Sequence, residues 1–80
     1  MNIFFYLNGQ NINIQSKSDD LFAEVAFKYM NKIGKQNEEL KFFYNSQELI
    51  PTSGKSLSDY KIINGARIDV VLASTVIGAL

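Results

Sequence analysis

The chain begins with a stretch that predicts a β-hairpin, residues 2–15, which read NIFFYLNGQNINIQ. The aliphatic and aromatic residues that share one face under a period of two are Ile3, Phe5, Leu7, Ile12 and Ile14. Such alternation is typical of strands with one buried face. Between the two runs lies Asn8-Gly9, a pair that readily adopts the positive φ angles of a type I′ turn. The stretch therefore predicts two antiparallel strands and, with them, a sheet that has one apolar face.

A helix is predicted after the hairpin. The apolar residues follow the spacing i, i+3, i+4, i+7, i+8 and i+11: Phe22, Val25, Ala26, Tyr29, Met30 and Ile33. Ser18, Asp19 and Asp20 offer acceptors for the first N–H groups of the helix, and Gly34 suits the left-handed residue that ends one. Phe27 falls outside the apolar stripe, so we expect it on the exposed side of the helix.

More strands are predicted after the helix. Residues 40–44 (LKFFY) are aromatic and strand-like, Asn45-Ser46 is a plausible turn, and residues 47–50 (QELI) form a short strand. A loop and a compact apolar cluster without clear period follow. Residues 67–72 (RIDVVL) then close the domain as a β-branched strand. The predicted order is ββαββ, a short irregular turn and a last β-strand.

One helix can cover only one face of such a sheet. We therefore predict an α+β fold with a mixed sheet of four to five strands and the helix packed across one face. The strand periodicity then leaves Phe4, Tyr6, Phe43 and Val71 on the opposite, wet face. These outward apolar side chains are candidates for contact with a partner, because a group of them would form a patch.

The composition narrows the classes of function. In 80 residues, eight basic side chains balance eight acidic ones, and there is no cysteine or histidine. A neutral protein lacks the field that nucleic-acid and anionic-membrane binders use, so we expect neither partner. The commonest general base and the usual zinc ligands are missing, and the chain shows no nucleophile with a base. We predict a monomer that is not an enzyme, holds no cofactor or metal, and resides in the cytoplasm or nucleus.

The chain resembles the ubiquitin-like family in its start MNIF, its helix, and above all residues 56–62 (SLSDYKI) with residues 68–72 (IDVVL). The resemblance covers residues 1–72 and needs a one-residue shortening at Asn8-Gly9 and a one-residue insertion near Thr52-Ser53. It implies a ubiquitin-like β-grasp domain over residues 1–72. Residues 73–80 are then a C-terminal tail or the start of a linker.

The resemblance also implies a protein-binding surface on the sheet. Phe43 and Val71 match the family's apolar positions on the third and last strands, and a leucine of the family's first turn corresponds loosely to Leu7 or Asn8. Lys41 keeps one basic flank, whereas Asp69 replaces a histidine-type position. The expected function is a non-catalytic interaction module whose partners are helices or loops of the ubiquitin-binding kind. Partners that grip with acidic residues should bind this less basic face worse.

A covalent modifier is the alternative function. Conjugated members of the family usually end in two glycines, whereas residues 73–80 read ASTVIGAL. Some related modifiers end in a single glycine that processing exposes. Under this alternative, cleavage of a precursor after Gly78 would create the conjugation terminus, and the conjugation machinery would be the partner. Neither the partner's identity nor the natural end of the chain follows from the sequence.

Overall fold

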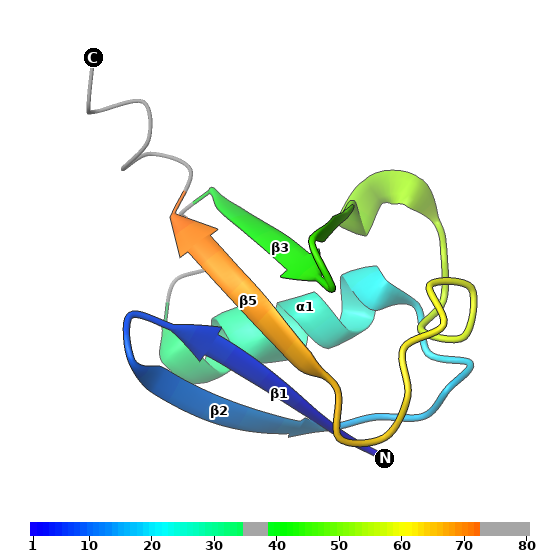
Figure 1. Ribbon diagram of the computed structural model, residues 1–80, viewed down its shortest axis with the longest axis horizontal. Coiled ribbons are helices and arrows are strands. Elements are labelled where there is room, and N and C mark those ends of the chain that lie inside the picture. Colours follow the sequence, from blue (N-terminus) through cyan, green and yellow to red (C-terminus); the bar gives the residue numbers. More distant parts are fainter. Residues whose placement is uncertain (35–38, 73–80) are drawn as a thin grey trace.

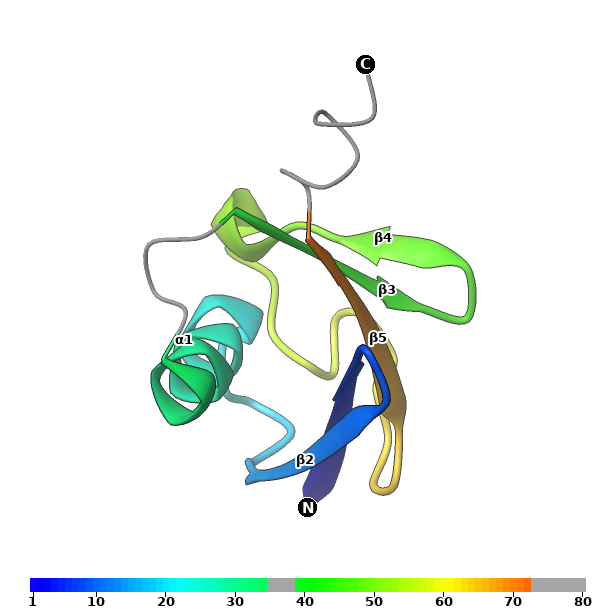
Figure 2. The same cartoon turned by 90° about the vertical axis from the view of Figure 1, so that its left-hand side faces the viewer.

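The computed structural model describes residues 1–34 and 39–72. Its elements, in chain order, are strands β1 (Asn2–Leu7) and β2 (Gln10–Gln15), helix α1 (Phe22–Ile33), strands β3 (Leu40–Tyr44) and β4 (Gln47–Leu49), the 3₁₀ turn η1 (Pro51–Ser53) and strand β5 (Arg67–Leu72). Helix α1 crosses one face of the sheet and leaves the other face uncovered by any described element (Figures 1 and 2). This is a small α+β domain, consistent with a β-grasp. The predicted tail, residues 73–80, lies outside the described residues.

The five strands form one mixed sheet in the order β2-β1-β5-β3-β4. Strands β1 and β5 run parallel at its centre, with Phe5 opposite Ile68, and the other neighbours are antiparallel. Phe42 of β3 faces Val70 of β5. The first and last strands of the domain are therefore direct neighbours.

Both tight turns are formed by residues with positive φ angles. Asn8 and Gly9 have φ angles of 50° and 81°, and Asn45 and Ser46 have φ angles of 51° and 66°. Two successive positive φ angles are the geometry of a type I′ turn, which matches the twist of the strands that it joins. The predicted hairpins over β1–β2 and β3–β4 are thus confirmed.

The core lies between α1 and the sheet and is rich in aromatic rings. Phe5 of β1 stacks on Tyr29 of α1, with 4.5 Å between the ring centroids. Phe42 meets Phe5 edge-on at 5.9 Å and Phe22 at 5.4 Å. Offset and edge-to-face pairs of this kind add to the gain from burial. On the far side of the helix, Phe27 is 56% exposed, as its place outside the apolar stripe predicts.

The two ends of α1 differ in how well the sequence predicted them. Gly34 ends the helix with a φ of 71°, and its N–H donates to the carbonyl of Asn31 at 3.3 Å, so the predicted C-terminus is confirmed. The predicted N-terminal acceptors are wrong. The residue that precedes the first turn is Leu21, whose N–H donates to the Glu24 side chain at 3.3 Å. Asp20 instead accepts the backbone N–H of Lys17 at 2.9 Å, which fixes the loop before the helix.

Candidate functional site

The face of the sheet that points away from α1, called the outer face below, carries a row of side chains across four strands. Tyr6 of β1 pairs with Asp69 of β5, Asp69 pairs with Phe43 of β3, and Phe43 pairs with Glu48 of β4. Residues paired across neighbouring strands point to the same face of a sheet. The row Tyr6, Asp69, Phe43 and Glu48 therefore lies on one surface, with Phe43 between two carboxylates.

A second row lies beside the first. Val71 of β5 pairs with Lys41 of β3, and the Val71 side chain is 39% exposed. Ile50 follows the end of β4 with extended backbone angles (φ −100°, ψ 110°) and is 41% exposed, while Leu49 before it is buried. Since side chains alternate along extended backbone, Ile50 continues the outer face. Phe43, Ile50 and Val71 together are called the outer patch.

The backbone beneath Ile50 is fixed from inside the domain. The hydroxyl of buried Tyr60 accepts the N–H of Ile50 at 3.0 Å and contacts its carbonyl oxygen at 3.3 Å. A second polar contact at 3.0 Å joins the Tyr60 hydroxyl to the hydroxyl of Ser53. Because these bonds restrain the chain where β4 passes into η1, the Ile50 side chain is presented from a defined position.

The charges of the outer face are arranged around the patch. Arg67 Nε lies 3.0 Å from Asp69 Oδ1, and the guanidinium of Arg67 lies 4.2 Å from the ring centroid of Tyr6. The Asp69 carboxylate is therefore balanced by Arg67. Within residues 1–34 and 39–72, the carboxylate of Glu48 and the ammonium of Lys41 form no ion pair. A negative charge beside Phe43 on the β4 side thus stays available to a partner.

The structure brings four of the five predicted surface residues together and separates the fifth. Phe43, Val71, Lys41 and Asp69 all lie on the outer face. Leu7 instead belongs to the core and is only 8% exposed, because it follows the same alternation as the buried Ile3 and Phe5 of β1. Leu7 therefore offers almost no surface to a partner.

Sequence reasoning missed Ile50 and Glu48 as members of the outer face. The available signal was the alternation through Leu49: once Leu49 is placed in the core, both of its neighbours must point outward. The predicted conjugation terminus at Gly78 lies outside the described residues.

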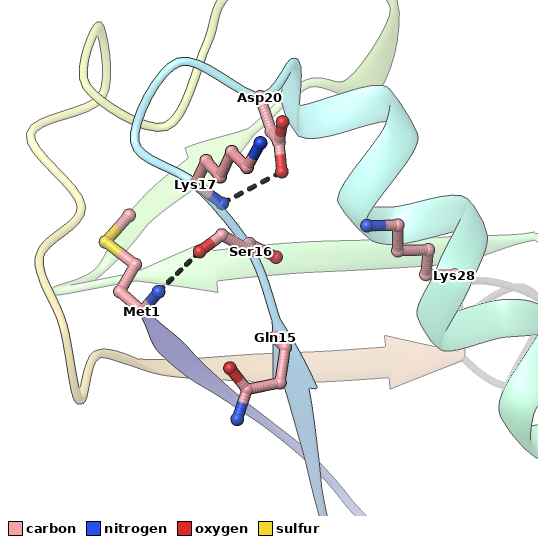
Figure 3. Close-up of a pocket in the computed structure, with 6 residues that line it drawn as sticks. All are labelled: Met1, Gln15, Ser16, Lys17, Asp20 and Lys28. Carbon is pink, nitrogen blue, oxygen red and sulfur yellow. Dashed lines mark hydrogen bonds between the residues drawn. The ribbon is translucent and has the colours of Figure 1, made fainter.

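A cavity of about 480 Å³ opens at a different place, between the end of β2 and α1 (Figure 3). The residues that line it are Met1, Gln15, Ser16, Lys17, Asp20 and Lys28. Ser16 is 7% exposed, and its Oγ has no hydrogen-bond partner among the described residues. The cavity is thus a polar and basic feature, unlike the outer patch.

Neither a metal site nor a membrane-spanning helix is found in the described part of the chain. Residues 1–34 and 39–72 contain no group of three or more acidic side chains close enough to hold a metal ion. The same residues include no helix that is long and apolar enough to cross a membrane. In comparisons with known proteins, the chain matches no protein-family model and no curated protein.

Proposed function

We propose that this protein is a ubiquitin-like protein–protein interaction module that binds its partners through the outer patch. The observation that carries the proposal is the outer patch itself: the exposed Ile50 and Val71 and the half-buried Phe43 lie on a sheet face that no described element covers. An isolated exposed apolar residue is ordinary, whereas a group on one rigid sheet is typical of an interaction site. The sequence resemblance and the helix across one face of a mixed sheet support the ubiquitin-like assignment.

The partner that fits this surface is a helix or loop with an apolar side chain for the outer patch and a basic side chain beside it. Phe43 is the aromatic member of the outer patch and is half-buried, and aromatic contacts dominate many interfaces. The carboxylates of Asp69 and Glu48 flank Phe43, and Asp69 is already paired with Arg67. The carboxylate of Glu48, which has no ion pair among the described residues, favours Lys or Arg in the part of the partner that meets the Phe43 ring, whereas the ammonium of Lys41 lies on the Val71 side of the face.

The first test is selection of peptides from a random library on the wild-type protein, followed by binding measurements with a Phe43→Ala variant. Loss of one central aromatic anchor should weaken binding by about tenfold or more. Phe27→Ala is the matched control, because Phe27 is more than half exposed on the opposite side of the domain and should leave affinity unchanged. Both variants are checked for folding by thermal unfolding.

The same selection tests the charge preference. Peptides from the wild type should be enriched in Lys and Arg, and a Glu48→Lys variant should reverse the enrichment towards Asp and Glu. If peptides bind but neither Phe43→Ala nor Glu48→Lys changes their affinity, the outer patch is not the binding site. If Phe43 matters and Glu48 does not, the patch is retained and only the basic partner is rejected.

A further inference from the structure

Ser16 is an unusual member of the buried interior. It comes directly after β2, on the side of the sheet that also carries the buried Ile14, where alternation would favour an apolar residue. Its backbone is held by β1, since its N–H donates to the carbonyl of Met1 at 2.9 Å and its carbonyl accepts the Met1 amine. Its hydroxyl, in contrast, has no partner among the described residues. A buried hydroxyl without a partner is costly, and a bound acceptor would remove that cost.

Two lysine ammonium groups share the cavity with Ser16, and Met1, whose amine donates to the Ser16 carbonyl, lines it as well. Lys28 extends from α1 towards Ser16, which follows the end of β2, and Lys17 lies in the loop after it (Figure 3). Asp20 is the one acidic residue of the lining, and one of its oxygens already accepts the backbone N–H of Lys17. Within residues 1–34 and 39–72 the structure shows one ion pair, between Arg67 and Asp69. In this part of the chain, neither Lys17 nor Lys28 therefore has a carboxylate within ion-pair distance.

We infer that this cavity binds a phosphate group, either free or as a phosphate monoester. A phosphate monoester carries about −1.5 to −2 charges and three acceptor oxygens, which suits two ammonium groups and a hydroxyl donor. Lysine serves as a point charge for phosphate and needs no fixed planar geometry. The cavity of about 480 Å³ is larger than a phosphate ion, which leaves room for the organic part of an ester. The site is separate from the outer patch, so the inference does not depend on the proposed function.

The test is a titration followed by two-dimensional ¹H–¹⁵N NMR, with inorganic phosphate in one arm and O-phosphoserine in the other. Sodium chloride at matched ionic strength controls for screening, and acetate controls for a general preference for anions. We expect saturable shifts of the amides of Ser16, Lys17 and Lys28 in at least one phosphate arm. The affinity should be on the order of millimolar, because solvent-exposed charge pairs contribute little.

Variants identify the groups that bind. Lys28→Gln removes one ammonium and should weaken binding about five- to tenfold. Ser16→Ala removes the hydroxyl and should weaken binding about threefold. Lys32→Gln is the matched control, because Lys32 lies one turn further along the same helix, carries the same charge and does not line the cavity. Its affinity for phosphate should equal that of the wild type.

The outcomes separate clearly. Saturation with inorganic phosphate supports a free-phosphate site, and saturation with O-phosphoserine alone supports an esterified ligand. Shifts that grow linearly in both arms, equal binding of acetate, or equal losses in Lys28→Gln and Lys32→Gln would each overturn the inference. Ser16→Ala is also informative if Lys28→Gln fails to fold, because it keeps every charge and a loss of affinity can then come only from the hydroxyl.

Discussion

Ser56 and Asp59 show how single side chains fix the irregular segment before β5. The N–H of Ser56 donates to Asp59 Oδ2 at 3.0 Å, and the N–H of Asp59 donates to Ser56 Oγ at 3.2 Å. Hydrogen bonds to the charged form of a carboxyl favour that form. The backbone N–H of Ser56, helped by the hydroxyl of the same residue, therefore lowers the pKa of Asp59 below its usual value. This reciprocal contact gives a local reason for the Ser-Leu-Ser-Asp stretch.

The lowered pKa of Asp59 predicts a pH dependence of stability. A carboxyl whose pKa is lower in the folded than in the unfolded state stabilises the fold above its unfolded pKa, about 3.9, and loses that contribution as the pH falls through the folded pKa. We expect Asp59→Asn to unfold at lower urea concentration than the wild type at neutral pH. The difference should shrink towards zero in acid. A difference that stays constant down to about pH 2 would contradict this.

Individual residues also show where the sequence was insufficient. Alternation placed Phe43 and Val71 on the outer face. Alternation also puts Leu7 on the buried face, whereas the resemblance to the family put it on the binding surface; the structure buries Leu7. Ser16 is a polar residue that follows the alternating run of β2, yet it is buried. Its burial depends on the neighbouring strand and the helix, which local periodicity does not describe. Ile50 was missed because the alternation was not followed through the buried Leu49 to the end of the predicted strand at residue 50.

Tyr29 is one of the buried residues through which the helix attaches to the sheet. Tyr29 stacks on Phe5 and also meets Phe42 edge-on, with 6.4 Å between the ring centroids of Tyr29 and Phe42. The Tyr29 side chain is almost fully buried, and burial raises the pKa of its phenol. The stability of α1 in this domain therefore depends on its apolar face rather than on helix propensity.

Truncation of the buried Tyr29 and of the exposed Phe27 compares two aromatic residues of the same helix, of which only Tyr29 packs in the core. We expect Tyr29→Ala to lower the free energy of unfolding by about 3–5 kcal/mol, because it removes a large side chain from a close-packed core. Phe27→Ala lies on the same helix and should change the free energy of unfolding by less than about 0.5 kcal/mol. Urea denaturation measures both. Equal effects of the two substitutions would show that the core contact does not hold the helix.

The elements themselves were largely predictable. Turn residues and a period of two identified the hairpins, and the apolar spacing identified the helix together with its end at Gly34. The start of the helix was not predictable, because Ser18, Asp19 and Asp20 all offer acceptors of the same kind. Tertiary contacts made the choice: the N–H of Phe22 donates to the carbonyl of Lys55 at 3.0 Å, which ties the start of the helix to a distant loop.

At the scale of the whole molecule, periodicity predicted a mixed sheet with one covered face but not the order of its strands. The parallel pairing of β1 with β5 joins residues from opposite ends of the domain, and nothing in either strand alone selects that neighbour. Local pattern fixes which face of a strand is apolar, whereas pairing depends on the packing of the complete chain. The same limit applies to the outer patch, because its members come from β3, from β5 and from the residue that follows β4.

The proposed function and its alternative predict different behaviour of the intact protein in cells. An interaction module should give no ladder of isopeptide-linked forms on a denaturing blot, and a Gly78→Ala change should leave the pattern unaltered. Intact mass measurement checks the same point. A species that ends at Gly78, with a ladder that disappears in the Gly78→Ala variant, would instead establish a covalent modifier.

The central position of β5 has a consequence for biosynthesis. Strand β5 separates β1 from β3 in the sheet, so the hairpin of β1 and β2 and the hairpin of β3 and β4 cannot join until β5 has been made. On the ribosome, α1 and both hairpins emerge first, with their apolar faces still exposed. Pairings between distant parts of a chain form slowly, and exposed strand edges favour aggregation. Closure of the sheet therefore has to wait until residues 67–72 have been made, and until then β1 and β3 each keep an unpaired edge.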